Sequence, residues 1–267
     1  MVRNFLLIAL SLWYMTAKSQ DHTFSQNVSS FTINAPQLSG ERKIWIYLPF
    51  NYKETDKKFP VIYMHDGQNL FDSFTSFAGE WRIDEVLDSL KAESIVIGIE
   101  NGGDKRINEL TPYTNEKYGG GDGDKYLDFL VNTLKPYVDE NYHTLTDRSN
   151  TTIFGSSLGG LISFYAILKY PKVFGKAGVF SPSFWFSEDM YDLVHNTETI
   201  DARIYFMAGD HESSETITDL ERMEELVKHK IKDKKQFRKK IVHNGRHNET
   251  LWTNEFEDAY LWLTAND

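Results

Sequence analysis

The chain has 267 residues, of which 40% are hydrophobic and 14% aromatic, so it can fold as a globular protein with a substantial core. It contains no cysteine, which excludes disulfides, thiolate metal sites and a cysteine nucleophile. Its formal net charge of −10 argues against nucleic acid as a partner, because phosphate backbones would be repelled.

The N-terminal segment has the features of an export signal. Arg3 supplies a positive charge, and residues 5–12 form an apolar run that is short for a membrane span. Ala17 and Ser19 provide the small-x-small pattern of a signal peptidase site. We therefore expect residues 1–19 to be cleaved and the mature protein to be exported, to the periplasm or outside the cell, without membrane attachment. An uncleaved membrane anchor or a buried first helix is the alternative.

The remaining residues, 20–267, are expected to form one domain in which strands and helices alternate. Short apolar or alternating segments predict strands at 43–49, 60–65, 94–100, 151–154, 176–180, 203–208 and 237–243. Helical patterns separate many of them, at 80–91, 124–140, 158–170, 215–230 and 252–264. This alternation predicts an α/β fold with a mostly parallel sheet and helices on both faces.

A Gly-x-Ser-x-Gly sequence stands between a predicted strand and a predicted helix. It consists of Gly155, Ser157 and Gly159 with the residues between them. At such a sharp turn the glycines avoid collisions, and the serine hydroxyl is raised above the sheet at the start of a helix. We therefore interpret Ser157 as a nucleophile, with the amide of Leu158 as one donor to the oxyanion.

A nucleophilic serine needs a histidine as general base, and His247 is the best candidate. In this arrangement the chain order is serine, acid, histidine, and five histidines follow Ser157. His247 lies on the loop after the last predicted strand, where it can reach the edge of the sheet that carries Ser157. His229 lies in a charged predicted helix, His195 lies in a polar stretch, and His243 ends the last predicted strand.

The acid that orients the histidine should follow the strand predicted at 203–208. Asp210 and Glu212 both qualify, and their spacing alone does not separate them. A second oxyanion donor is expected from the amide of Gly67 or Gln68, on the loop after the strand at 60–65.

No metal or cofactor is expected. His65 and Asp66 could be ligands together with His211 or His247, but no pair has a recognised metal-binding spacing.

Several motifs together resemble the putative esterase family of α/β-hydrolases, which includes feruloyl and acetylxylan esterases, S-formylglutathione hydrolases and siderophore trilactone esterases. The motifs are HDGQNLFD (65–72), EWRIDEVL (80–87), RINELTPY (106–113), GSSLGG (155–160), FGKAGVFSPSFW (174–185) and GRHNETLW (245–252). They are most similar to the branch of ferri-bacillibactin-esterase-like proteins. The resemblance implies an α/β-hydrolase fold with Ser157 and His247 as nucleophile and base, and it favours Glu212 as the acid. It also implies that Trp81, Arg106 and Trp185 lie near the substrate.

The sequence thus predicts an exported serine carboxylic ester hydrolase whose partner is a small-molecule or carbohydrate ester. Ester-decorated carbohydrates and phenolic esters are favoured, because aromatic residues are frequent in the predicted active-face loops. A siderophore trilactone esterase is the alternative, and it would require a basic cluster, for which Arg106 and Arg246 are the candidates. A non-catalytic binding protein on the same scaffold is an alternative of another class. The oligomeric state is left open.

Overall fold

The structure is a computed structural model that describes residues 22–265, so the predicted signal at 1–19 lies outside the described residues. Eight strands form one sheet in the order β1-β2-β4-β3-β7-β8-β9-β10. Strand β2 pairs antiparallel with β1 and β4, and every other pair is parallel. The strands are β1 (Val28–Ala35), β2 (Gly40–Tyr47), β3 (Val61–His65), β4 (Ile95–Ile99), β7 (Thr151–Ser156), β8 (Lys176–Phe180), β9 (Arg203–Gly209) and β10 (Phe237–Val242).

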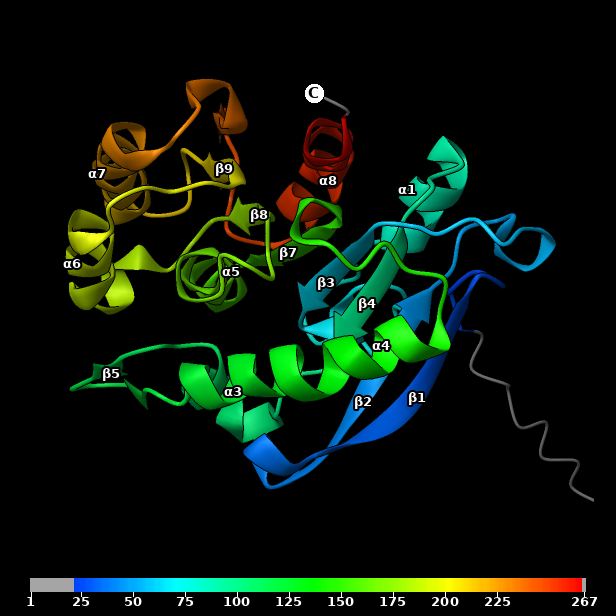
Figure 1. Ribbon diagram of the computed structural model, residues 1–267. Coiled ribbons are helices and arrows are strands. Elements are labelled where there is room, and N and C mark those ends of the chain that lie inside the picture. Colours follow the sequence, from blue (N-terminus) through cyan, green and yellow to red (C-terminus); the bar gives the residue numbers. More distant parts are fainter. Residues whose placement is uncertain (1–21, 266–267) are drawn as a thin grey trace, which may run out of the picture.

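Helices cover both faces of this sheet. Helices α1 and α8 lie on one face, and the long segment of α3 and α4 lies on the other, together with α5 to α7 (Figure 1). The arrangement confirms the predicted α/β-hydrolase fold. The helices are α1 (Ile83–Leu90), α2 (Arg106–Glu109), α3 (Gly123–Phe129), α4 (Lys135–Asn141), α5 (Leu158–Lys169), α6 (Asp189–Asn196), α7 (Ser214–Lys230) and α8 (Glu249–Thr264).

The core consists of two apolar layers separated by the sheet. Alternate side chains of β3 enter different layers: Ile62 and Met64 join the layer under α1 and α8, whereas Val61 and Tyr63 join the layer under α3 to α7. All five residues of β3 are buried, as are all five of β4. Burial on both faces explains why these strands are continuous apolar runs rather than alternating ones.

The predicted helix at 124–140 is divided. Between α3 and α4 lies η5 (Leu130–Leu134), a single wider turn of π type. Pro136, in the first turn of α4, lacks an amide hydrogen, and its ring would collide with the carbonyl four residues earlier in a regular α-helix. A wider turn before the proline relieves this conflict.

The parallel strands direct their carboxyl ends to one edge of the sheet. The segments that leave β3, β7, β8, β9 and β10 at this edge contain the residues from which we build the candidate site. No helix within residues 22–265 combines the length and the apolarity needed to span a bilayer.

Candidate active site

Ser157 lies at a tight turn between β7 and α5. Its φ of 57° and ψ of −121° are rare for a residue with a side chain, and two backbone hydrogen bonds hold it there. Its amide donates to the carbonyl of Phe180 at 3.0 Å, and its carbonyl accepts from the amide of Ser183 at 3.1 Å. A side chain on Gly155 would place its Cβ 2.8 Å from the carbonyl carbon of Gly159, so the close turn requires glycine there.

The buried side chain of His65 packs against this turn. Its Cδ2 atom would lie 2.9 Å from a Cβ on Gly155, and its Nδ1 is 2.7 Å from the hydroxyl of Tyr126. Burial lowers the pKa of His65 to about 4, so the ring is neutral at neutral pH. Nδ1 of His65 thus contacts Tyr126, while the carboxylate of the neighbouring Asp66 bonds Arg106.

Ser157 and His247 line the same cavity, whose volume is about 860 Å³. The hydroxyl of Ser157 lies 3.3 Å from the hydroxyl of Ser183. Among the described residues, Ser183 is the only partner that hydrogen-bonds the hydroxyl of Ser157, and His247 does not bond it. Bonds between nucleophile and base often form only when substrate binds, so the arrangement is compatible with both roles.

Glu212 lies directly behind His247. Its Oε2 is 2.8 Å from Nδ1 of His247, and only 1% of its side chain is exposed. Its other oxygen accepts hydrogen bonds from the hydroxyl of Ser181 at 2.6 Å and from the amide of Gly209 at 2.7 Å. Ser181 in turn accepts from the indole of Trp252 at 2.9 Å. The carboxylate is therefore fixed, and it holds the imidazole by Nδ1.

Asp210, the alternative acid, faces different partners. Its carboxylate is 2.7 Å from Nδ1 of His211 and 2.9 Å from Nδ1 of His243, and it accepts from the amide of Asn244. The bonds to His211 and then His243 lower the pKa of Asp210 to about 2. The geometry thus brings Glu212, and not Asp210, to His247.

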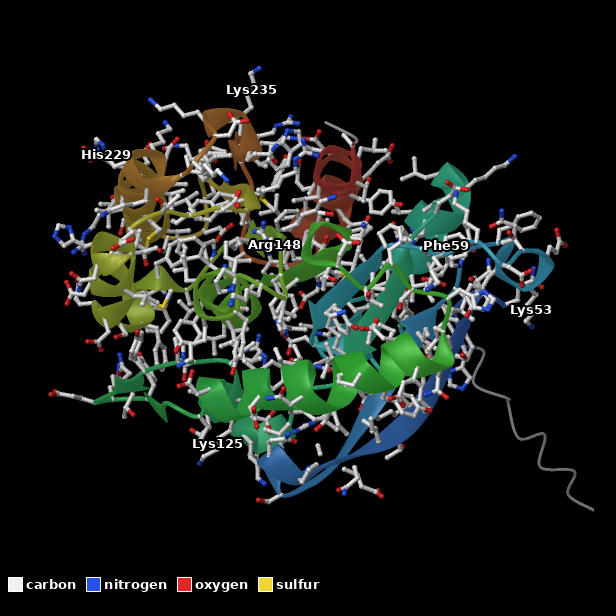
Figure 2. The ribbon with its side chains drawn as sticks, in the orientation of Figure 1. Lys53, Phe59, Lys125, Arg148, His229 and Lys235 are labelled. Carbon is white, nitrogen blue, oxygen red and sulfur yellow. The ribbon has the colours of Figure 1, made fainter. Side chains whose placement is uncertain are left out.

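The two histidines set aside in the sequence analysis are distant from this arrangement. His195 is exposed on α6, and His229 is exposed on α7. Figure 2 shows His229 at the outer edge of α7, pointing away from the molecule like Lys125 and Lys235. Neither histidine lines the cavity beside Ser157.

The expected oxyanion donors occupy two adjacent elements. Leu158 is the first residue of α5, so its amide has no acceptor within the helix and lies at the positive end of the helix dipole. Gly67 and Gln68 begin η3 (Gly67–Asn69), directly after β3. A Cβ on Gly67 would lie 2.6 Å from the carbonyl carbon of Gly98, so this turn is pressed against β4.

Arg106 lines the cavity but is already paired. Its Nε and one terminal nitrogen contact the two carboxylate oxygens of Asp66 at 2.7 and 2.8 Å. Asn101 donates to the same carboxylate at 2.6 Å. Although burial opposes it, Arg106 with Asn101 holds the pKa of Asp66 below its ordinary value. The side chain of Arg106 is therefore largely neutralised before any ligand arrives.

Of the two tryptophans expected near the substrate, one lines the cavity. Trp81 is 3% exposed and packs against Trp252, with ring centroids 5.5 Å apart, so it forms part of the wall. Trp185 is 51% exposed, stands edge-on to Tyr118 and lies outside the set of cavity-lining residues.

Sequence reasoning did not assign a role to several of the residues that the structure brings to Ser157 or the cavity. Ser183 contacts the hydroxyl of Ser157, and Phe77, Asn101 and Glu249 line the cavity. Ser183 and Glu249 belong to motifs quoted above, so motif membership could have indicated them. Phe77, which is 93% exposed at the cavity, carries no such signal.

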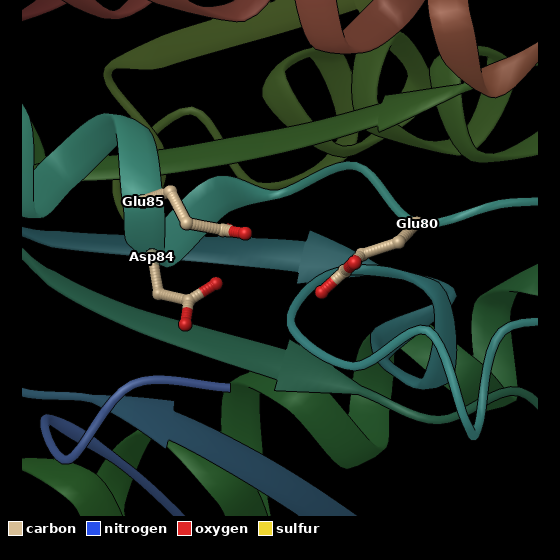
Figure 3. Close-up of side chains that lie close together, drawn as sticks. All are labelled: Glu80, Asp84 and Glu85. Carbon is tan, nitrogen blue, oxygen red and sulfur yellow. The ribbon is translucent and has the colours of Figure 1, made fainter. Parts of the chain in front are cut away.

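A separate group of carboxylates surrounds the start of α1. Glu80, Asp84 and Glu85 each offer an oxygen within 4.8 Å of the others, and Figure 3 shows the three side chains converging. Asp84 accepts from the amide of Ser25, and Glu85 pairs with Arg82. Burial, together with the neighbouring Glu85, raises the pKa of Asp84 to about 7. Glu80 also accepts a hydrogen bond from the hydroxyl of Thr23, so Glu80 and Asp84 together hold the segment before β1 against the start of α1.

Comparison with known proteins shows the family and the fold of the chain. The family model described as "Putative esterase" matches residues 35–263. The uncharacterized protein YbbA of Bacillus subtilis is 30% identical over 252 residues, which is 84% of this chain and 93% of that protein. Ferri-bacillibactin esterase BesA of the same organism is 28% identical over 142 residues, 47% of this chain and 48% of BesA. A solved ferulic acid esterase has the same fold, with a TM-score of 0.67, 15% identity and coverage of 89% and 96%.

Proposed function

Because the chain belongs to the putative esterase family, we propose that it is a serine carboxylic ester hydrolase in which Ser157, His247 and Glu212 form a catalytic triad. Membership of the family supports a hydrolase. The observation that carries the finer proposal is the 2.8 Å contact between Glu212 and Nδ1 of His247, whose side chain lines the same cavity as a serine at a strained turn.

The contacts suggest how the three side chains divide the work. With Nδ1 bonded to Glu212, the Nε2 of His247 is left to take the proton of the Ser157 hydroxyl. The serine oxygen attacks the ester carbonyl, and the negative oxygen that forms is bound by the Leu158 amide and an amide of Gly67 or Gln68. The imidazolium, stabilised by Glu212, returns its proton to the leaving alcohol. Water then releases the acyl group by the same route.

For the substrate, we propose an ester-decorated carbohydrate or a phenolic ester, met after export of the protein. A cavity of about 860 Å³ is large enough for a ring-bearing group, and Phe77, Trp81 and Trp252 line it beside polar side chains. Aromatic faces suit sugars and phenolic rings, while the polar groups can bind hydroxyls.

Two alternatives carry less support. A siderophore trilactone esterase is suggested by the name of the relative BesA, but the cavity offers one arginine, and Asp66 already neutralises it. A non-catalytic binding protein would not need the buried Glu212 to hold His247 beside a strained serine.

The experiment that tests the proposal combines covalent labelling with turnover. A fluorophosphonate probe should label the wild-type protein at Ser157, and p-nitrophenyl butyrate should be hydrolysed. Ser157→Ala and His247→Ala should each lower kcat by about 10⁴-fold or more, and the double variant should be scarcely worse than either. Ser214→Ala, an exposed serine at the start of α7, is the matched control and should be unchanged. Retained turnover in Ser157→Ala would exclude the triad.

A further inference from the structure

We propose that the cavity beside Ser157 selects uncharged or cationic esters and rejects anionic ones, with Glu249 as the principal determinant. The inference rests on the proposed esterase function and goes beyond it, because it fixes the charge of the substrate group that enters the cavity. It is drawn from the charges that line the cavity: four carboxylates, those of Asp66, Glu100, Asp104 and Glu249, against the single guanidinium of Arg106.

Pairing removes part of this charge and leaves a negative remainder. Arg106 is bound through two nitrogens to Asp66, and Lys43 lies 3.2 Å from Glu100. Within residues 22–265 neither Asp104 nor Glu249 forms an ion pair. The guanidinium is thus already paired, while two carboxylates that line the cavity have no cationic partner among the described residues, so an anionic group in the cavity would meet net repulsion.

Among these carboxylates, Glu249 has the greatest influence on the charge of the cavity. It is only 9% exposed and is the first residue of α8, where the helix dipole favours a negative charge. Asn248 caps the helix by accepting a hydrogen bond from the amide of Leu251. A Cβ on Gly79 would lie 3.3 Å from the Cβ of Glu249, so the neighbouring loop closes over the stem of this side chain. The carboxyl group is thereby held in the cavity wall.

Charged groups around Glu249 come from several elements. His247 precedes it on the same loop, and Asp66 and Arg106 face it from the loop after β3 and from α2. Burial raises the pKa of Glu249. The positive charges of His247 and Arg106 oppose this increase, whereas the negative charge of Asp66 adds to it. Because Arg106 is already bonded to Asp66, its guanidinium is not free to bind an incoming anion. Sugar hydroxyls, by contrast, can donate hydrogen bonds to these carboxylates.

Esters of similar size that differ in charge test the inference. On the acyl side the probes are the p-nitrophenyl esters of 5-methylhexanoate, hemiglutarate and 4-trimethylammoniobutyrate, which are neutral, anionic and cationic. On the alcohol side they are the butyrates of 3,3-dimethylbutanol, 3-sulfopropanol and choline. In at least one series, kcat/KM for the anion should be about tenfold or more below the neutral ester, and 0.5 M NaCl should narrow the gap. Equal or faster turnover of the anion in both series would overturn the inference.

Variants then locate the effect. Glu249→Gln should raise the ratio of anionic to neutral kcat/KM by about fivefold or more, and Asp104→Asn should raise it in the same direction. Glu140→Gln, which removes an exposed carboxylate on α4, is the control and should leave the ratio unchanged.

The outcomes separate selection from other roles. If Glu249→Gln slows all three esters equally and shifts the pH profile, Glu249 acts on His247 and the inference is wrong. Should Glu249→Gln fail to fold, Asp104→Asn and the salt dependence still decide the matter. Turnover and labelling without charge discrimination would contradict the inference alone. Absence of both labelling and turnover of every ester would contradict the proposed function itself.

Discussion

At the scale of single residues, the acid partner of His247 is where geometry adds most to the sequence. Two carboxylates two positions apart are equivalent in a sequence, since either could reach a histidine on a neighbouring loop. The structure separates them by their hydrogen bonds: Glu212 is buried against His247 and Ser181, whereas Asp210 bonds two exposed histidines outside the cavity. Which side chain faces inward depends on the path of the loop after β9, which no local pattern encodes.

The two acids should therefore respond differently when each is converted to its amide. Glu212→Gln should lower kcat by about 10³-fold or more, because the imidazole is then held in the wrong tautomer. Asp210→Asn should change kcat by less than about tenfold, since it loses only contacts with His211, His243 and Asn244, which lie outside the cavity. Steady-state kinetics on p-nitrophenyl butyrate is the measurement. The reverse ranking would transfer the role to Asp210, and two mild effects would point to a Ser157–His247 dyad.

At the scale of elements, the sequence predicted the central strands and the long helices well. The strand predicted at 176–180 coincides with β8, and the helix predicted at 158–170 differs from α5 by one residue. These segments are buried on both faces or strongly apolar, so a local pattern is sufficient. Strand β1 and helix α6 were missed. Strand β1 is an edge strand in which only the first and last residues are buried and the six between them are exposed or partly buried, and α6 is only eight residues long.

The tight packing of η3 against β4 gives a prediction at this scale. In Gly67→Ala the new Cβ would approach backbone atoms of Gly98 and Ile99 at 2.6–2.8 Å, and backbone cannot move aside as a flexible side chain can. The turn must shift and carry the amide of Gln68 with it. We expect kcat to fall by about 10²-fold or more, the size of effect seen when one oxyanion donor is lost.

Gly40→Ala is the matched control for this change, since a Cβ there meets nothing within 4 Å. It should leave kcat within about twofold. Thermal melts of both variants separate a displaced turn from general unfolding. Unaltered kcat in a folded Gly67→Ala protein would show that the turn is not needed to bind the oxyanion.

At the scale of the whole molecule, two buried groups make stability depend on pH in opposite directions. The folded pKa of His65, about 4, is below its ordinary value of 6.5, so the stability that it contributes is present above pH 6.5 and is lost as pH falls toward 4. The folded pKa of Asp84, about 7, is above its ordinary value of 3.8, so its contribution is present below pH 3.8 and is lost as pH rises toward 7. Between pH 4 and 6.5 the two slopes offset each other.

The difference in Tm between the wild type and a variant that lacks one group reports the pH dependence contributed by that group. In Asp84→Asn the side chain cannot ionise, so the charge that the wild type must bury near Glu85 and Glu80 at high pH is absent (Figure 3). An asparagine oxygen can still accept the amide of Ser25. The Tm of Asp84→Asn minus that of the wild type should therefore increase by at least about 3 °C between pH 4 and pH 8.

The control for this last measurement is Asp56→Asn, at an exposed aspartate, which should show no such trend. Both variants should be melted with EDTA present, because three carboxylates within 4.8 Å could also hold an adventitious cation. If calcium raises the Tm of the wild type but not that of Asp84→Asn, a bound ion and not a retained proton relieves the repulsion. A Tm difference that is constant with pH would show that Asp84 is ionised throughout. In that case the charge near Glu85 is tolerated, because Arg82 and the Ser25 amide stabilise it sufficiently.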